Sequence, residues 1–102
     1  LLSRKSIEEM TINHIGDLYV YPRYRLISGD KFGLGLCIRT EKGQYDLLES
    51  LGAYTWSGIF YTRFLVDPKE KMIIVFLTQV YPYGHLALHE QLRVLAYQSI
   101  AN

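Results

Sequence analysis

The most constraining feature of the sequence is a pair of apolar segments joined by a short turn. Residues 54–66 and 72–78 carry the apolar side chains, and Asp67-Pro68-Lys69-Glu70 lies between them. Proline at the second position has the fixed φ that a type I turn requires. Two strands joined by so short a turn pair antiparallel. Because residues 72–77 are apolar at every position, we expect this strand to lie in the centre of its sheet.

A third strand is predicted by alternation between residues 32 and 39. Phe32, Leu34, Leu36 and Ile38 alternate with smaller or polar residues, which is the period of a strand with one apolar face. Two of the alternating positions, Gly33 and Gly35, would let a neighbouring element approach closely.

Helices are predicted at both ends of the chain. Residues 2–10 form a short helical pattern with Ser3 as the candidate N-cap. Residues 85–100 form a longer one with a stripe made of Leu88, Leu92, Leu95 and Ala96. We therefore expect an α+β fold in which a short N-terminal helix and a C-terminal helix pack on an antiparallel sheet.

Size and charge exclude several classes of protein. The chain has 102 residues, which is one domain at most, and its formal charge of +1 gives no broad field for nucleic acid. The longest apolar run has six residues, residues 72–77, whereas about 20 are needed to span a bilayer. We therefore expect no nucleic-acid partner and no membrane span. The single cysteine, Cys37, cannot form an internal disulfide and is expected to be a small core or interface residue.

Few residues suggest chemistry by themselves. Ser57 lacks the Gly-x-Ser-x-Gly turn that would present a nucleophile, so a structural or backbone role is favoured. His85 and His89 have metal-ligand spacing, but the glutamate follows the second histidine and the zinc-protease pattern fails. We expect no metal and no cofactor. The tyrosines of residues 19–24 are compatible with either a ligand groove or a loop packed on the sheet.

Several segments, in order along the chain, resemble the C-terminal part of one enzyme family. The matching stretches are residues 2–14, 16–17, 32–36, Trp56-Ser57-Gly58, 66–70 and 74–79. Together they resemble serine β-lactamase-like and penicillin-binding-protein-like hydrolases, and most of all their class C and esterase branch. The resemblance implies that residues 1–102 are a single C-terminal segment of a larger β-lactamase-like domain. The start at Leu1 without methionine agrees with such a piece.

The resemblance assigns Trp56-Ser57-Gly58 to the family's Lys-Thr-Gly step on an edge strand beside the nucleophile. Trp56, Ser57 and Gly58 would then bind substrate, and the backbone amide of Ile59 would be a donor of the oxyanion hole. Trp56 replaces a cation that would bind a substrate carboxylate, which favours a neutral ester or amide over a β-lactam.

The family's other motifs are missing from the predicted elements. We expect neither Ser-x-x-Lys nor Tyr-x-Asn anywhere in the chain, so this chain alone is not expected to catalyse hydrolysis. The parent protein would be a serine hydrolase, for which the family slightly favours a periplasmic or secreted location. A non-catalytic ligand-binding module and a protein-interaction module remain as alternatives. Because the sheet would be incompletely covered, we also expect the isolated chain to self-associate.

Overall fold

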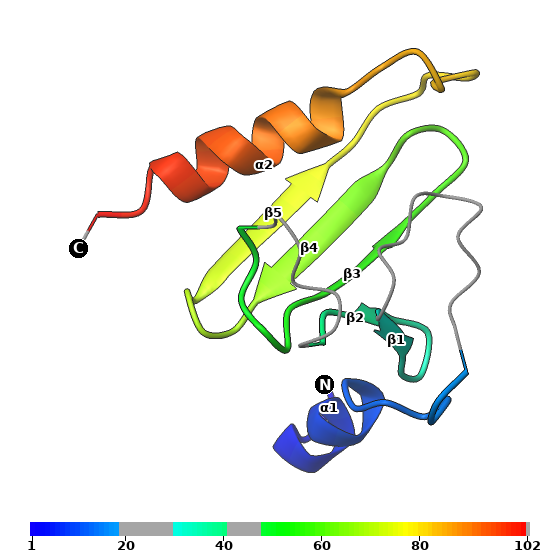
Figure 1. Ribbon diagram of the computed structural model, residues 1–102, viewed down its shortest axis with the longest axis vertical. Helices are drawn as coiled ribbons and strands as arrows, with labels where there is room; N and C mark the ends of the chain where they lie inside the picture. Colours follow the sequence, from blue (N-terminus) through cyan, green and yellow to red (C-terminus); the bar gives the residue numbers. More distant parts are fainter. Residues whose placement is uncertain (19–29, 41–47, 102) are drawn as a thin grey trace.

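Five strands form one antiparallel sheet in the computed structural model, which describes residues 1–18, 30–40 and 48–101 (Figure 1). The strand order is β1-β2-β3-β4-β5. The elements are α1 (Arg4–Met10), β1 (Lys31–Phe32), β2 (Cys37–Ile38), β3 (Tyr54–Ser57), β4 (Arg63–Asp67), β5 (Met72–Phe76) and α2 (Leu88–Gln98). The expected α+β class, with a short N-terminal and a longer C-terminal helix, is therefore confirmed.

The predicted hairpin is present as β4 and β5. Asp67 pairs with Met72 at the turn and Arg63 pairs with Phe76 at the far end. The segment of residues 54–66, expected as strand material, divides into β3 and β4 because a second turn over residues 58–62 reverses the chain.

The strand predicted over residues 32–39 is wrong in its extent. It is a small hairpin, in which Phe32 of β1 pairs with Cys37 of β2 around a turn that contains Gly35 at φ 81°. The expected close approach at Gly33 is found, because a Cβ there would collide with the backbone carbonyl of Met10. The end of α1 therefore packs directly against this hairpin.

The N-terminal helix begins where the sequence predicts. Ser3 is its N-cap, and the Ser3 hydroxyl oxygen accepts a hydrogen bond from the Ser6 N–H at 3.1 Å. Leu34 N–H donates to the Met10 carbonyl at 3.0 Å, which joins the helix end to the β1–β2 turn.

The expectation that residues 72–77 form a central strand is wrong for the described part of the chain. β5 is the last strand in the order and pairs only with β4. Its two faces differ, since α2 covers the face of Ile74 and Phe76, whereas Ile73, Val75 and Leu77 are 69%, 59% and 77% exposed. We name the face that carries these three exposed residues the open face. The uniform apolarity of β5 therefore reflects a strand whose second face lacks cover within the described residues.

The stripe predicted for the C-terminal helix is only partly the surface that meets the sheet. Leu92 faces the sheet, but Leu88 and Leu95 are exposed. Polar side chains at a spacing of four residues make the directed contacts instead, namely His89, Arg93 and Tyr97. None of the helices in the described residues is long and apolar enough to cross a membrane.

The open face predicts how the isolated chain behaves. Exposed contiguous apolar surface favours association, so the 102-residue chain should form oligomers at micromolar concentration. Light scattering measures this, and replacing both Ile73 and Val75 by threonine, which keeps β-propensity while removing apolar surface, should shift the distribution toward monomer. A monomer with a cooperative melt in the unmodified chain would contradict the prediction.

Candidate functional site

The second half of β3 has an unpaired edge among the described residues. β2 pairs with Tyr54 and Thr55, while Trp56 and Ser57 have partners only on β4. The Gly58 N–H donates to the Thr62 carbonyl at 2.9 Å, so alternation along the ladder directs the N–H and C=O of Ser57 away from β4. The expected edge strand is thus an edge only over its last two residues.

The turn that follows β3 is held by several contacts. The Tyr61 N–H donates to the Gly58 carbonyl at 3.2 Å, and Tyr61 has φ 68°. The Phe60 carbonyl accepts from the Thr78 hydroxyl at 2.7 Å and from the Val80 N–H at 3.2 Å. These bonds fix the backbone on both sides of Ile59.

The Ile59 amide is unpaired in this fixed turn. Ile59 is 62% exposed, and within the described residues its N–H donates to no backbone or side-chain acceptor. An exposed N–H in a turn that is restrained on both sides is a preorganised donor, which is what an oxyanion hole requires.

Gly58 has an internal reason to be glycine. A Cβ at this position would collide with Thr62 Oγ1, so a side chain there would require the Thr62 hydroxyl to move. The expected benefit, close approach of a substrate to the backbone, stays a prediction.

Trp56 presents an aromatic surface beside the unpaired edge. Its ring meets Phe32 edge-to-face, with centroids 5.2 Å apart and planes at 72°, and the residue remains 44% exposed. Ser57 is exposed next to it, and within the described residues its hydroxyl has no hydrogen-bond partner and no basic group to activate it. The pair offers contact surface rather than a nucleophile.

The two spaced histidines do not act together. The His89 ring stacks on Tyr61 with centroids 3.9 Å apart, and His89 Nε2 lies 2.8 Å from the Tyr61 carbonyl oxygen. Burial lowers the pKa of His89, so the neutral ring is favoured in this contact. Residues 1–18, 30–40 and 48–101 contain no group of three or more potential metal ligands.

Cys37 is a core residue, as the sequence predicts. It is buried in β2, and burial, followed by the nearby Asp30 carboxylate, raises the pKa of its thiol to about 11. The reactive thiolate is therefore scarce at neutral pH.

The expectation that the chain has no Ser-x-x-Lys is wrong as to spacing, since one runs from Ser28 to Lys31. Lys31 begins β1, and its Nζ donates to the Leu18 carbonyl at 2.9 Å. Ser28 and the tyrosines of residues 19–24 lie outside the described residues, so the groove or packing role of those tyrosines stays a prediction.

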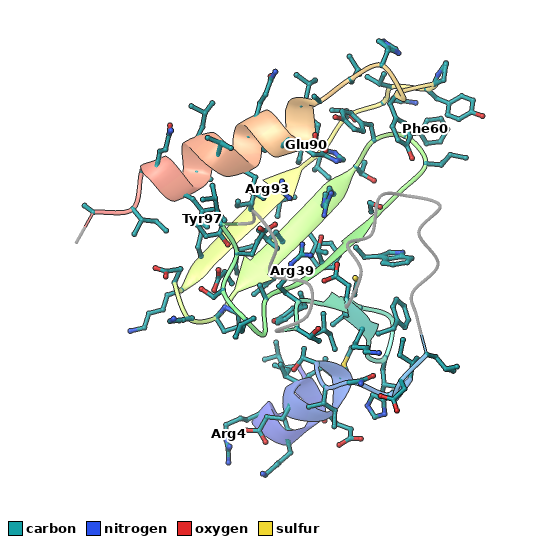
Figure 2. All side chains as sticks on the ribbon, viewed as in Figure 1. Arg4, Arg39, Phe60, Glu90, Arg93 and Tyr97 are labelled. Carbon is teal, nitrogen blue, oxygen red and sulfur yellow. The ribbon has the colours of Figure 1, made fainter. Side chains whose placement is uncertain are left out.

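Sequence reasoning missed a network of buried charges that runs from Asp30 and Arg39, beside β2, through Glu49 to Arg93 of α2. Arg39 Nη1 donates to both oxygens of Asp30 at 2.8 Å, and Arg93 Nη1 donates to Glu49 Oε1 at 3.0 Å. Figure 2 shows Arg93 and Tyr97 on the side of α2 that faces the sheet. No local pattern marks Asp30 or Glu49 as buried, but an arginine and a tyrosine four apart on a helix could have signalled a polar contact.

A small cavity lies between α2 and the sheet. Its volume is about 30 Å³, and its polar lining comes from Glu49, Arg63, His89 and Arg93. Such a volume suits about one or two water molecules rather than an acyl substrate. The unpaired end of β3 is therefore the better candidate for a substrate site.

Asp67 is a buried carboxylate that accepts hydrogen bonds from three different residues. It is fully buried, and it accepts hydrogen bonds from the Tyr97 hydroxyl at 2.6 Å, the Ser50 N–H at 2.9 Å and the Glu70 N–H at 3.2 Å. Burial by itself raises the pKa of this carboxyl, but the three donors outweigh it and hold the pKa below the ordinary value.

No protein-family model matches this chain, and no curated protein is detectably similar to it.

The Asp67–Tyr97 contact predicts a defined loss of stability. Tyr97→Phe removes one hydrogen bond to a charged group, so the free energy of unfolding should fall by about 1.5–3 kcal/mol. Because the folded pKa of Asp67 is depressed, its stabilising contribution is present above about pH 4 and is lost as pH falls through the folded pKa. Denaturant unfolding at several pH values measures both effects.

In the Tyr97→Phe chain the Asp67 pKa should move up, so the acid loss of stability begins at a higher pH. Tyr83→Phe serves as the control, since Tyr83 stacks on Tyr61 without touching Asp67. An unchanged acid limb in Tyr97→Phe would contradict the role given to this hydrogen bond.

Proposed function

We propose that this chain is the C-terminal segment of a serine hydrolase of the β-lactamase-like kind. In that proposal the end of β3 lies beside a nucleophile carried by the rest of the protein. The Ile59 N–H stabilises the oxyanion of the tetrahedral intermediate, and Trp56, Ser57 and Gly58 contact the substrate.

The observation that carries the proposal is the Ile59 amide, which has no hydrogen-bond acceptor among the described residues. It is exposed, and hydrogen bonds at Gly58 and Phe60 restrain the turn on either side of it. One such donor contributes about 3–4 kcal/mol to transition-state stabilisation in acyl transfer. The adjacent N–H and C=O of Ser57, directed away from β4, are available to an extended substrate.

The open face is a second support for a segment of a larger domain. A β-sheet must cover an apolar face to be stable in water. The exposed Ile73, Val75 and Leu77 would be covered by further helices or strands of the parent protein.

Trp56 supports a neutral substrate. By the resemblance, Trp56 takes the place of the family's cation, so its exposed indole offers an aromatic surface at that position. Esters or amides without such a carboxylate therefore fit this end of β3 better than β-lactams.

A protein-interaction module is the second candidate. The observation that favours it is the same exposed apolar row on β5, because monomeric proteins seldom expose large contiguous apolar patches. An upstream reading frame with a helical Ser-x-x-Lys followed by Tyr-x-Asn would decide for the hydrolase, and an upstream stop codon would decide for the interaction module.

The oxyanion role of the Ile59 amide is tested by removing its N–H. In the full-length protein, Ile59→Pro should lower kcat for ester hydrolysis by about 10²–10³-fold, whereas Ile59→Ala, which keeps the N–H, should stay within a few fold. Thermal melts must show that both variants are folded. Equal activity in the folded Pro and Ala variants would refute the assignment.

Covalent labelling of the full-length protein tests whether Ser57 is the nucleophile. Ser57→Ala should lower kcat/KM while leaving covalent labelling by a fluorophosphonate probe intact. Complete loss of labelling in a folded Ser57→Ala protein would make Ser57 the nucleophile and overturn the alignment with the family.

The substrate preference predicts relative rates. The full-length enzyme should have a higher kcat/KM for short-chain aryl esters than for a chromogenic cephalosporin, because Trp56 provides no cation. The 102-residue chain should hydrolyse neither compound. A faster cephalosporin reaction would contradict the substrate class, and activity of the short chain would contradict the missing nucleophile.

A further inference from the structure

We propose that His89 of α2 is a positioning residue for the Ile59 amide, on which it acts through Tyr61. The inference deepens the proposed function and rests on it for the kinetic test, whereas the structural test is independent of it. Three features carry it: the backbone conformation of Tyr61, reciprocal contacts between Tyr61 and His89, and the peptide plane that contains the Ile59 N–H.

Tyr61 occupies a turn position at which glycine is the usual residue. The Gly58 N–H donates to the Thr62 carbonyl at 2.9 Å and closes a hairpin loop of three residues. The third residue of such a loop commonly adopts a left-handed conformation, which glycine tolerates best. Tyr61 has φ 68° at this position, and a bulky side chain disfavours that backbone region. Contacts of Tyr61 outside the turn must therefore stabilise this conformation.

The Tyr61 ring is held by aromatic side chains and is only 4% exposed. It stacks on His89 with centroids 3.9 Å apart and planes at 17°, and on Tyr83 at 4.9 Å and 22°. Phe76 of β5 meets it edge-to-face at 5.8 Å. The first turn of α2 and the β3–β4 turn lie at the same end of the sheet (Figure 1). His89 therefore joins the helix directly to the turn.

Tyr61 and His89 each bind the backbone of the other. His89 Nε2 lies 2.8 Å from the Tyr61 carbonyl oxygen, and because a carbonyl only accepts, Nε2 carries the proton. In return, the His89 N–H donates to the Tyr61 hydroxyl at 3.2 Å. Ala87, the N-cap of α2, provides no side-chain cap, so this hydroxyl satisfies one of the free N–H groups at the helix start. The same pair thus stabilises both the helix start and the turn.

The peptide between Gly58 and Ile59 transmits this contact to the candidate donor. The Gly58 carbonyl accepts a hydrogen bond from the Tyr61 N–H at 3.2 Å. In a planar trans peptide the C=O and N–H groups point in opposite directions, so this bond directs the Ile59 N–H away from Tyr61. His89 holds the carbonyl of Tyr61, and it thereby restrains the residue whose N–H sets the direction of the Ile59 N–H.

A role limited to stability gives a different expectation for the loss of His89. The melting temperature would then fall, and kcat of the folded enzyme would stay the same. A positioning role instead lowers kcat and leaves KM nearly constant, because the oxyanion forms only on the way to the transition state.

Two variants of similar side-chain length test the donor in the full-length protein. His89→Gln keeps an N–H donor for the Tyr61 carbonyl, whereas His89→Met has none. His89→Met should lower kcat for ester hydrolysis about tenfold with KM within about twofold, because a displaced amide loses part of the effect of an oxyanion-hole donor. His89→Gln should restore most of the lost kcat. His85→Met is the matched control, since His85 is exposed and precedes α2, and it should leave kcat unchanged.

The direction of the Ile59 N–H is measured without substrate. Residual dipolar couplings of the full-length protein labelled with ¹⁵N-isoleucine report N–H directions, and the signal lost in Ile59→Val identifies Ile59. In His89→Met the Ile59 coupling should change, whereas that of Ile38, in β2, should stay the same. His89→Gln should return the Ile59 coupling toward its value in the unmodified protein.

Thermal melts show which variants are folded. If His89→Met does not fold, His89→Phe takes its place, because it keeps a ring for stacking on Tyr61 and also lacks the donor. An unchanged Ile59 coupling in a folded variant without the donor overturns the inference, as does an equal loss of kcat in the Gln and Met variants. Absence of ester hydrolysis by the unmodified protein contradicts the proposed function instead, and the dipolar coupling then decides whether His89 positions the amide.

Discussion

The buried carboxylate of Asp67 is the contact on which the arrangement of sheet and helix depends. It joins the end of β4, the segment before β3 and the last turns of α2, through donors from Glu70, Ser50 and Tyr97. A fully buried charge is tolerable only when its hydrogen-bonding capacity is satisfied. The three donors meet that condition, so the register of α2 on the sheet is fixed by a polar contact rather than by leucine packing alone.

The same helix also restrains the candidate site at the end of β3. Two turns of helix before Tyr97, His89 stacks on Tyr61 and approaches its carbonyl, and the His89 N–H donates to the Tyr61 hydroxyl at 3.2 Å. Tyr61 closes the turn that contains the Ile59 amide. The position of that amide is thus coupled to how α2 docks, which connects a stability determinant to the geometry of the proposed oxyanion donor.

The sequence predicted elements that depend on local patterns and missed those that depend on distant partners. The Ser3 cap, the β4–β5 turn and the closeness required at Gly33 each follow from a few neighbouring residues. Whether residues 72–77 lie at the centre or the edge depends on which other strands exist, and periodicity does not contain that information. The Ile59 amide was assigned from the family resemblance, since a free N–H leaves no mark on side-chain composition.

The two faces of this small sheet differ in the side chains that they carry. On the α2 face, Arg93 donates to Glu49 Oε1 and Asp67 accepts from Tyr97 and two backbone N–H groups, whereas Glu49 Oε2 is buried without a hydrogen-bond partner among the described residues. Ile73 and Val75 of β5 lie outside this network and are exposed on the open face. The interface with α2 is therefore mixed, with Ile74, Phe76 and Leu92 beside the charged groups, whereas the open face is apolar. The contacts with α2 order the chain internally, and the open face keeps Ile73, Val75 and Leu77 exposed among the described residues.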